Sequence, residues 1–172
     1  VAAIRQSAVA IQSAIAMPSP TPSVSVVVPM RNATPWLPSL LAALVHDWDT
    51  GFELVVVDDD SQDGSADLIR QLCAHWPTER WQLLEGKGEG VSSARNQGIM
   101  ASRADVIAFL DADDRPFAGR LSKPLHQLAC HPQPSHVHGG WLPSNPQVTL
   151  PSSAFPRQDG VCFSWPQFIE PT

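Results

Sequence analysis

The chain has 172 residues, of which 43% are hydrophobic, 16% are charged and 17 are prolines. A chain of this length can bury one ordinary globular core, and the many prolines predict long connecting segments. The formal net charge of −6 argues against a nucleic-acid partner, which would require a basic surface. No apolar run approaches the roughly 20 residues that a membrane-spanning helix needs, so we expect no transmembrane segment.

The three cysteines, Cys73, Cys130 and Cys162, are odd in number, widely spaced and without a metal-ligand pattern. We therefore expect free thiols in a reducing compartment and a cytoplasmic location, with peripheral membrane association left open. Polar and charged residues interrupt the apolar character of residues 1–16, which argues against a signal peptide. Residues 1–22 are predicted to form a flexible or helical extension.

From residue 23 onward, short β-branched runs alternate with helical stretches. Strands are predicted at residues 24–28, 52–57, 81–84, 106–110 and 135–138, and helices at residues 34–45, 65–74, 92–102 and 119–130. Pro29 is expected to stop the first strand, and Thr34 to cap the first helix. This alternation predicts a three-layer α/β/α sandwich with a mostly parallel sheet over residues 23–142. Residues 143–172 are predicted to be a loop-rich segment.

Two groups of carboxylates follow predicted strands directly, at Asp58–Asp60 and at Asp111–Asp114. Ligands of parallel sheets bind beyond the carboxyl ends of the strands, where both groups would lie. Closely spaced carboxylates repel one another unless a cation or a hydrogen-bond donor compensates, and they are ligands that Mg²⁺ or Mn²⁺ prefers. Asp residues also form turns and helix caps, but two groups at one edge favour a binding site.

A glycine-rich segment at residues 86–90 leads into the predicted helix at residues 92–102. Backbone N–H groups at a helix N-terminus favour an anion, but the segment lacks the spacing of a Walker A loop or a dinucleotide fingerprint. Before the helix predicted at residues 65–74, Asp63 or Ser65 is expected to be the cap residue, and Gly64 is expected to allow a tight turn. We therefore assign these three residues a structural role.

Four motifs, in this order, resemble those of family 2 glycosyltransferases. Residues 26–32 (Val-Val-Val-Pro-Met-Arg-Asn) resemble the opening strand and its Pro-x-Tyr-Asn loop. Residues 57–65 (Val-Asp-Asp-Asp-Ser-Gln-Asp-Gly-Ser) resemble the Val-Asp-Asp-Gly-Ser-Thr-Asp-Gly-Ser signature. Residues 90–98 resemble Gly-x-x-x-Ala-Arg-Asn-x-Gly, and residues 109–114 resemble Phe-Leu-Asp-x-Asp-Asp. Any one motif would be weak, whereas four in order make a specific match.

The resemblance implies a GT-A fold and transfer of a sugar from a nucleotide-diphosphate sugar, with UDP as the expected nucleotide, to a saccharide, lipid or protein acceptor. By this resemblance Pro29 and Arg31 would line the base pocket, and Asp59 would accept the N3–H of a uracil-like base. Arg95 would lie near the base or the diphosphate, and Asp111 would border the ribose and the sugar.

The resemblance also implies a divalent metal, Mn²⁺ or Mg²⁺, with Asp113 as its ligand and the diphosphate completing the coordination shell. Such a metal stabilises negative charge on the departing nucleoside diphosphate. Inverting members of the family use a later Asp or Glu as general base. Asp159 and Glu170 are the only carboxylates beyond residue 141, and neither has a recognisable context, so no catalytic base is predicted.

Three residues depart from the family pattern, of which Gln62, in place of Thr, is expected to have no consequence. Arg31 replaces the usual Tyr, so base stacking would have to come from a guanidinium face or be lost. Asp60 replaces the usual Gly, which strains the turn if φ is positive there. We expect the chain to be truncated in its acceptor-binding half, which leaves a second hypothesis, a nucleotide-sugar-binding fragment without catalysis. Response-regulator and dehalogenase-like domains are disfavoured because their acidic residues would follow the first strand.

Overall fold

A computed structural model describes residues 23–130 and 136–137 of the chain. The predicted N-terminal extension and C-terminal segment lie outside these residues, so the predicted domain boundaries stay predictions. The described part forms two compact units, and we consider each by itself. The first comprises residues 23–38 and 51–114, and the second comprises residues 39–50, 115–130 and 136–137.

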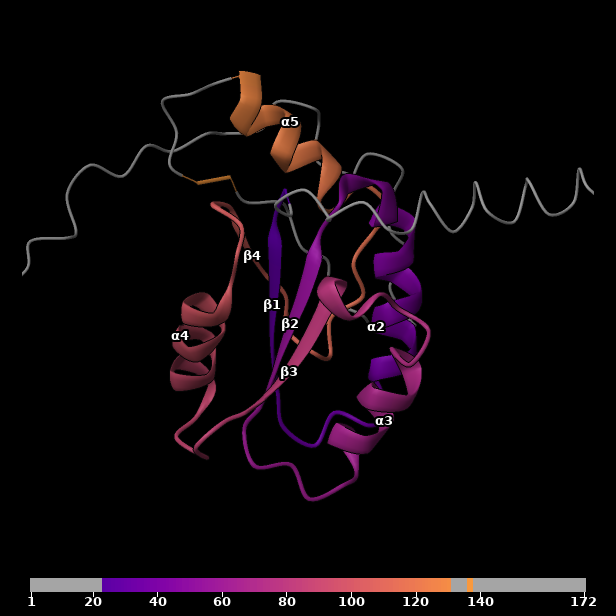
Figure 1. Cartoon of the computed structure of the whole chain (residues 1–172), viewed down its shortest axis with the longest axis vertical. Coiled ribbons are helices and arrows are strands. Elements are labelled where there is room, and N and C mark those ends of the chain that lie inside the picture. Colours follow the sequence, from indigo (N-terminus) through magenta and orange to yellow (C-terminus); the bar gives the residue numbers. More distant parts are fainter. Residues whose placement is uncertain (1–22, 131–135, 138–172) are drawn as a thin grey trace, which may run out of the picture. The chain divides into compact units, whose positions relative to one another are not determined.

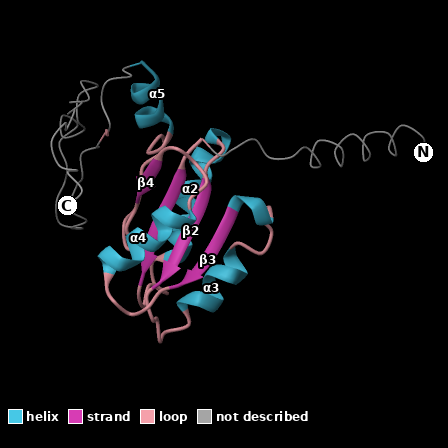
Figure 2. Ribbon diagram, turned by 60° about the vertical axis from the view of Figure 1, so that its left-hand side comes forward, coloured by secondary structure: helices cyan, strands magenta, loops and turns pink. Residues whose placement is uncertain are grey.

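The first unit is built on a parallel sheet. Its elements are β1 (Ser25–Met30), β2 (Glu53–Asp58), α3 (Ser65–Leu72), a 3₁₀ turn (Thr78–Arg80), β3 (Trp81–Glu85), α4 (Val91–Ala101) and β4 (Ile107–Phe109). The four strands run parallel in the order β3-β2-β1-β4. Helix α4 lies on one face of the sheet and α3 on the other (Figures 1 and 2). The predicted α/β class with a parallel sheet is therefore confirmed.

The two central strands supply the core of the first unit. Apolar residues fill β1 and β2 almost without interruption and are fully buried, as expected for parallel strands that are covered on both faces. Helix α4 presents Ala94 and Gly98 to these strands, and α3 buries Ile69. Burial raises the pKa of the Cys73 thiol, just beyond α3, to about 11, so this cysteine is an unreactive core residue.

Strand β1 does not stop at Pro29, contrary to the prediction, but continues to Met30. The N–H of Ser25 and the carbonyl of Val27 face β4. Because the backbone polar groups of every second residue in a strand point the same way, the nitrogen of Pro29 also faces β4. Strand β4 ends at the partner of Val27, so no ladder hydrogen bond is lost where proline has no N–H.

Helix α2 (Leu37–Leu44) begins later than predicted. Thr34 does not cap it, because its hydroxyl donates to the carbonyl of Asp63 in a neighbouring loop. The sequence predicts an apolar stripe on this helix that consists of Trp36, Leu37, Leu40, Leu41, Leu44 and Val45. Its four leucines are buried, which confirms that part of the pattern. Trp36 and Val45 are exposed, so their predicted inward position is wrong.

The second unit contains a 3₁₀ segment (Val45–Thr50) and α5 (Ser122–Cys130). The buried carboxylate of Asp47 accepts the backbone N–H groups of Leu121 and Ser122, at 3.4 and 3.5 Å, where α5 begins. Of the predicted strand at residues 135–138, only residues 136 and 137 are described, and neither lies in a strand. No described helix is long and apolar enough to cross a membrane.

Glycine 98 sets the distance between α4 and the sheet. A Cβ at this position would lie 2.4 Å from Cγ1 of Val27, which is closer than two carbon atoms that are not bonded to each other can approach. Glycine is ordinarily unfavourable inside a helix, but here it lets α4 pack directly on β1 and β2.

We expect Gly98→Ala to lower the free energy of unfolding by about 1–3 kcal/mol, because the new methyl group would overlap Val27. Helix propensity alone would favour alanine by about 1 kcal/mol, so a net loss reports the packing. Urea unfolding measures the change. The double variant Val27→Ala/Gly98→Ala should be more stable than the sum of the two single changes predicts. A Gly98→Ala protein as stable as the wild type would contradict the close approach.

A buried carboxylate fixes the other end of the sheet. Glu53 is 1% exposed and accepts the Ser25 hydroxyl at 2.5 Å and the backbone N–H and Nε of Arg103 at 2.6 and 2.7 Å. The Ser25 hydroxyl also accepts the N–H of Ala104. Burial raises the pKa of Glu53, but the hydrogen bonds from Ser25 and Arg103 outweigh it and hold the pKa below its usual value. This network attaches the segment before β4 to β1 and β2.

The lowered pKa makes a prediction about acid stability. A carboxyl with a lower pKa in the folded state contributes stability that is present above its unfolded pKa, about 4.3, and lost as the pH falls through the folded pKa. We expect Glu53→Gln to lower the free energy of unfolding at pH 7 by on the order of 2 kcal/mol. This is less than a fully buried ion pair would lose, because Arg103 is half exposed and solvent screens its charge. Below about pH 4, the difference from the wild type should shrink. Urea unfolding from pH 3 to 7 tests this, with Glu89→Gln as an exposed control; a difference independent of pH would contradict it.

Candidate functional site

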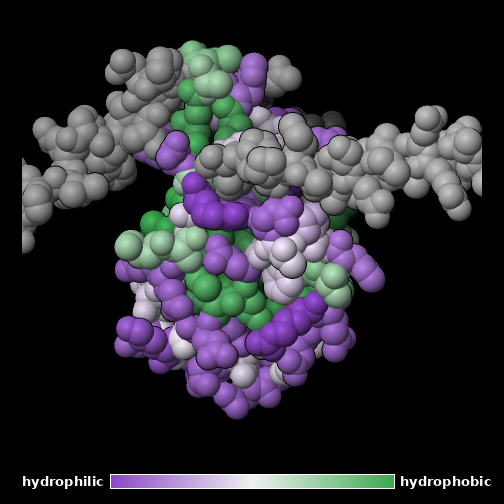
Figure 3. Space-filling model, in the orientation of Figure 1, coloured by the Kyte–Doolittle hydropathy of each residue, from purple (hydrophilic) through white to green (hydrophobic). Residues whose placement is uncertain are grey.

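All six residues that the sequence singled out lie in the first unit, at the carboxyl-terminal edge of the sheet or on α4. They are Pro29 and Arg31 at the end of β1, Asp59 after β2, Arg95 on α4, and Asp111 and Asp113 after β4. Polar side chains gather at this end of the unit, the lower end in Figure 3. The parallel strands therefore bring the six residues to one edge, while their roles stay predictions.

Asp59 is the most buried of these side chains, with 4% of its surface exposed. Its backbone N–H extends the ladder by donating to the carbonyl of Met30. One carboxylate oxygen, Oδ2, accepts the N–H of Gly90 at 2.8 Å. The other oxygen, Oδ1, is buried and has no hydrogen-bond partner. A buried acceptor without a partner costs free energy, so Oδ1 of Asp59 is available to a donor from outside the described residues.

Two glycines create this environment around Asp59, a role that the motifs did not predict for them. A Cβ at Gly86 would lie 2.9 Å from the carbonyl oxygen of Asp58 and 3.2 Å from Oδ1 of Asp59, so only glycine allows β3 to end so close. Gly90 precedes α4 at φ 95° and ψ 173°, a conformation open to glycine, and directs its N–H at Asp59. The run of glycines had indicated a weak phosphate loop, whereas both glycines position a carboxylate.

Arg95 follows from the packing of α4. Its neighbour Ala94 is buried against the sheet, which leaves the arginine at the side of the helix that faces Asp111. Its Nη2 donates to Oδ1 of Asp111 at 2.5 Å, in an ion pair whose side chains are 35% and 48% exposed. The Nε of Arg95 is buried and has no partner.

Asp59 Oδ1 and Arg95 Nε are the only buried side-chain nitrogen or oxygen atoms without a hydrogen-bond partner in the described part of the chain. One is an acceptor and the other is a donor. Asp59 is hydrogen-bonded to Gly90, which directly precedes α4, and Arg95 lies five residues after Gly90. A ligand with a donor beside an acceptor could satisfy both atoms.

The segment after β4 forms a turn, in which the N–H of Asp114 donates to the carbonyl of Asp111. Asp111 is bound by Arg95, while the exposed Asp113 makes no hydrogen bond or ion pair to any described residue. No group of three His, Cys, Asp or Glu residues within the described ranges could hold a metal by itself. A metal bound at this turn would therefore need ligands besides the carboxylates of the described residues.

Hydrogen bonds join the loop after β1 to the loop after β2. Asn32, at φ 51°, donates its N–H to the Ser61 hydroxyl and accepts the N–H of Gln62 on its side chain. Asp63 accepts hydrogen bonds from Ser65 and Thr34, which hold the pKa of its carboxyl well below the usual range. These contacts confirm the structural role expected of Asp63.

The capping prediction for α3 needs a correction. Gly64 precedes the helix at φ 84°, so the tight turn is as expected. Neither Asp63 nor Ser65 is the cap residue, because the helix begins at Ser65 itself and Gly64 has no side chain. The Ser65 hydroxyl instead bridges the loops by accepting the N–H of Ala33 and donating to Asp63.

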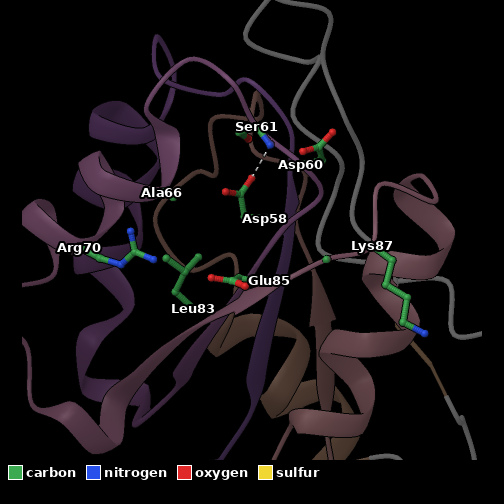
Figure 4. A pocket seen from close by; sticks show the side chains of 9 residues that line it. Asp58, Asp60, Ser61, Ala66, Arg70, Leu83, Glu85 and Lys87 are labelled. Carbon is green, nitrogen blue, oxygen red and sulfur yellow. Dashed lines mark hydrogen bonds between the residues drawn. The ribbon is translucent and has the colours of Figure 1, made fainter.

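A cavity of about 330 Å³ lies on the α3 side of the same edge (Figure 4). Its lining carries both charges and consists of Asp58, Asp60, Ser61, Ala66, Arg70, Leu83, Glu85, Gly86 and Lys87. Arg70 is engaged by Asp67 at 2.9 Å, and Asp58 accepts the N–H of Ser61. None of the six predicted residues lines it, so this cavity is not the site that the motifs describe.

Comparison with known proteins decides the family. The model for "Glycosyl transferase family 2" matches residues 25–153. The chain belongs to this family. It is 35% identical over 102 residues to an uncharacterized glycosyltransferase of Rickettsia bellii, covering 59% of the chain and 14% of that relative. It is 34% identical over 115 residues to the glycosyltransferase AglE of Haloferax volcanii, covering 66% of the chain and 38% of that relative.

Solved structures agree on the fold of this family 2 chain. The structure of TarS 1-349 of S. aureus matches with a TM-score of 0.58 at 24% identity, and the match covers 70% of this chain and 38% of that one. The mannosyltransferase PcManGT from Pyrobaculum calidifontis, solved in complex with GDP-Man and Mn²⁺, has a TM-score of 0.57 at 25% identity and covers 69% of the chain and 37% of PcManGT. The GT-A fold expected from the motifs is therefore confirmed, and the chain spans well under half the length of these relatives.

Proposed function

We propose that this chain forms the donor-binding part of a metal-dependent glycosyltransferase and binds a nucleotide-diphosphate sugar at the carboxyl-terminal edge of its sheet. The observation that carries the proposal is the pair of buried atoms without partners, Oδ1 of Asp59 and Nε of Arg95. A folded protein leaves such atoms unpaired at a cost of about 1–3 kcal/mol each, which a ligand can recover. Family membership supports sugar transfer as the use of that site.

The nucleobase that we propose is uracil. Its edge presents one donor, N3–H, between two carbonyl acceptors, which matches one acceptor oxygen on Asp59 and one N–H on Arg95. A guanine edge has two donors, which a carboxylate accepts with its two oxygens. Oδ2 of Asp59 already accepts the N–H of Gly90, so one oxygen is left, which fits the single donor of uracil better. Relatives with both kinds of nucleotide are known in structure, since TarS is solved with UDP-GlcNAc and PcManGT with GDP-Man.

The residues after β4 fit a divalent metal that is shared with the donor. Asp113 is exposed and unpaired among the described residues, so its carboxylate can bind Mn²⁺ or Mg²⁺ without breaking a contact. Hard divalent ions commonly use one or two protein carboxylates and take their other ligands from phosphate and water. When bound, the metal would neutralise charge on the leaving diphosphate. PcManGT, solved with Mn²⁺, supports this choice by similarity.

The remaining site residues orient the donor. Asp59 fixes the base edge, and Pro29, buried beside it at the end of β1, would form the floor of the base pocket. Arg95 holds Asp111 at 2.5 Å, so that the free oxygen of Asp111 can accept a ribose or sugar hydroxyl. The acceptor, a saccharide, lipid or protein, and the group that deprotonates it are not assigned to any described residue.

A second candidate function is donor binding without transfer. It requires only the donor site, at which Asp59 and Arg95 each keep one buried atom without a partner. Incubation of this chain with UDP-sugars and Mn²⁺, followed by detection of released UDP, separates the two functions. Release of UDP supports a transferase, and nucleotide binding without release supports a binding module.

We expect Asp59→Asn to weaken UDP binding about 5- to 150-fold, because one acceptor oxygen is replaced by a donor and the base N3–H loses its partner. Calorimetry with UDP, GDP and ADP measures the effect, which should be largest for UDP. Asp67→Asn, an exposed change on α3, serves as the matched control. An equal loss for all three nucleotides would contradict the assignment of Asp59 to the base.

We expect Asp113→Ala to abolish the increase in UDP affinity that Mn²⁺ produces, while the metal-free affinity and the unfolding midpoint stay unchanged. The reason is that Asp113 is exposed and makes no described contact, so its loss affects the metal alone. Titrations with and without Mn²⁺ measure this, with Asp114→Ala as the neighbouring control. If Asp114→Ala removes the metal effect and Asp113→Ala does not, the metal ligand is assigned to the wrong residue.

A further inference from the structure

Two of the departures from the family motifs, Arg31 and Asp60, meet in space. Arg31 follows the last residue of β1, and Asp60 lies two residues beyond the end of β2. Nη2 of Arg31 is 4.0 Å from Oδ2 of Asp60, and the two side chains are 54% and 59% exposed. Because Met30 pairs with Asp58 in the sheet, Arg31 lies beside Asp59. The ion pair therefore borders the buried carboxylate of the proposed base site.

Both the backbone and the side chain of Asp60 are constrained. Its backbone has φ 64°, in the left-handed region, which confirms that this turn requires the conformation that the usual Gly adopts without strain. Its Oδ1 accepts the N–H of Gln62 Nε2 at 2.9 Å, and a Cβ added at Gly88 would lie 3.5 Å from the Cβ of Asp60, so the loop after β3 passes close by. The oxygen that remains, Oδ2, faces Arg31.

Stability does not account for this arrangement. An exposed ion pair contributes about 0–1 kcal/mol, and a distance of 4.0 Å is long for one. A non-glycine residue in the left-handed region costs about the same amount or more. The pair is thus close to neutral for folding, and its effect is to direct the guanidinium of Arg31.

The direction follows from the strand order. In the sheet β3-β2-β1-β4, Asp60 and Gly88 lie in the loops after β2 and β3, on the opposite side of β1 from β4. Pairing with Asp60 draws the guanidinium toward Asp59 and away from the carboxylates after β4, where the diphosphate and its metal would bind. Arg31 is therefore directed at the base rather than at the phosphates.

We propose that Asp60 orients Arg31 so that the plane of its guanidinium covers the nucleobase bound at Asp59. This inference rests on the proposed function and adds a base-contacting residue and a positioning residue to it. A guanidinium is planar and weakly hydrated and stacks on aromatic rings, which the ammonium of lysine does not do. Stacking of this kind changes affinity by about 3- to 30-fold, from about 0.5–2 kcal/mol converted at room temperature.

The experiment compares uridine with UDP, each titrated by NMR into the full 172-residue chain without metal. Arg31→Ala should weaken uridine and UDP by the same factor, about 3- to 30-fold, because the lost contact is to the base. Arg31→Lys should lose most of that factor although it keeps the charge. Asp67→Asn/Arg70→Ala, which removes an exposed ion pair on α3, is the control and should bind like the wild type.

The positioning role of Asp60 has its own test. Asp60→Asn should lower uridine affinity in the wild type by part of the Arg31→Ala factor, and should have no effect in the Arg31→Ala background. A purely structural role would lower affinity equally in both backgrounds. Circular dichroism of each variant confirms that it folds.

The outcomes distinguish a failure of the Arg31 proposal from a failure of the proposed donor-binding function. Wild-type binding that Arg31 variants leave unchanged overturns the inference alone. A loss for UDP without a loss for uridine also overturns it, because the contact is then to the diphosphate. A wild-type chain that binds neither uridine nor UDP, with or without Mn²⁺, overturns the proposed function together with the inference.

Discussion

The contact of α4 with the two central strands is the constraint from which the site follows. Gly98 permits the helix to lie where any side chain would strike Val27. That position brings Gly90, before the first turn, within 2.8 Å of the Asp59 carboxylate. It also places Arg95 against Asp111, which follows β4. One close approach between helix and sheet thus joins residues from three separate segments of the chain.

The motif residues divide into those that satisfy one another and those left unsatisfied. Hydrogen bonds of Asn32 to the backbone of Gln62, and of Ser65 to Ala33 and Asp63, hold two loops together. Asp59 and Arg95 each keep one buried polar atom without a partner. A folded chain tolerates such atoms where a ligand completes the hydrogen bonds, so the unpaired atoms point to binding and the paired ones to architecture.

The sequence predicted the elements well where local pattern and tertiary context agree. Buried parallel strands appear as continuous apolar runs, and β1 and β2 were found for that reason. Boundaries failed where a distant partner decided them. Pro29 stays in β1 because β4 has already ended beside it, and α5 begins where Asp47 accepts its first N–H groups. The role of Gly86 was missed because its close neighbours are 27 and 28 residues away.

The sequence by itself determined the fold family and which residues lie at the carboxyl-terminal edge of the sheet. The reason is that the segments that follow parallel strands all begin at the same edge. It also identified Arg31 and Asp60 as departures from the family motifs. Only the tertiary structure decided that these two face each other, and that Oδ1 of Asp59 and Nε of Arg95 lack partners. Pairing and burial depend on contacts between segments some thirty residues apart, which no local pattern encodes.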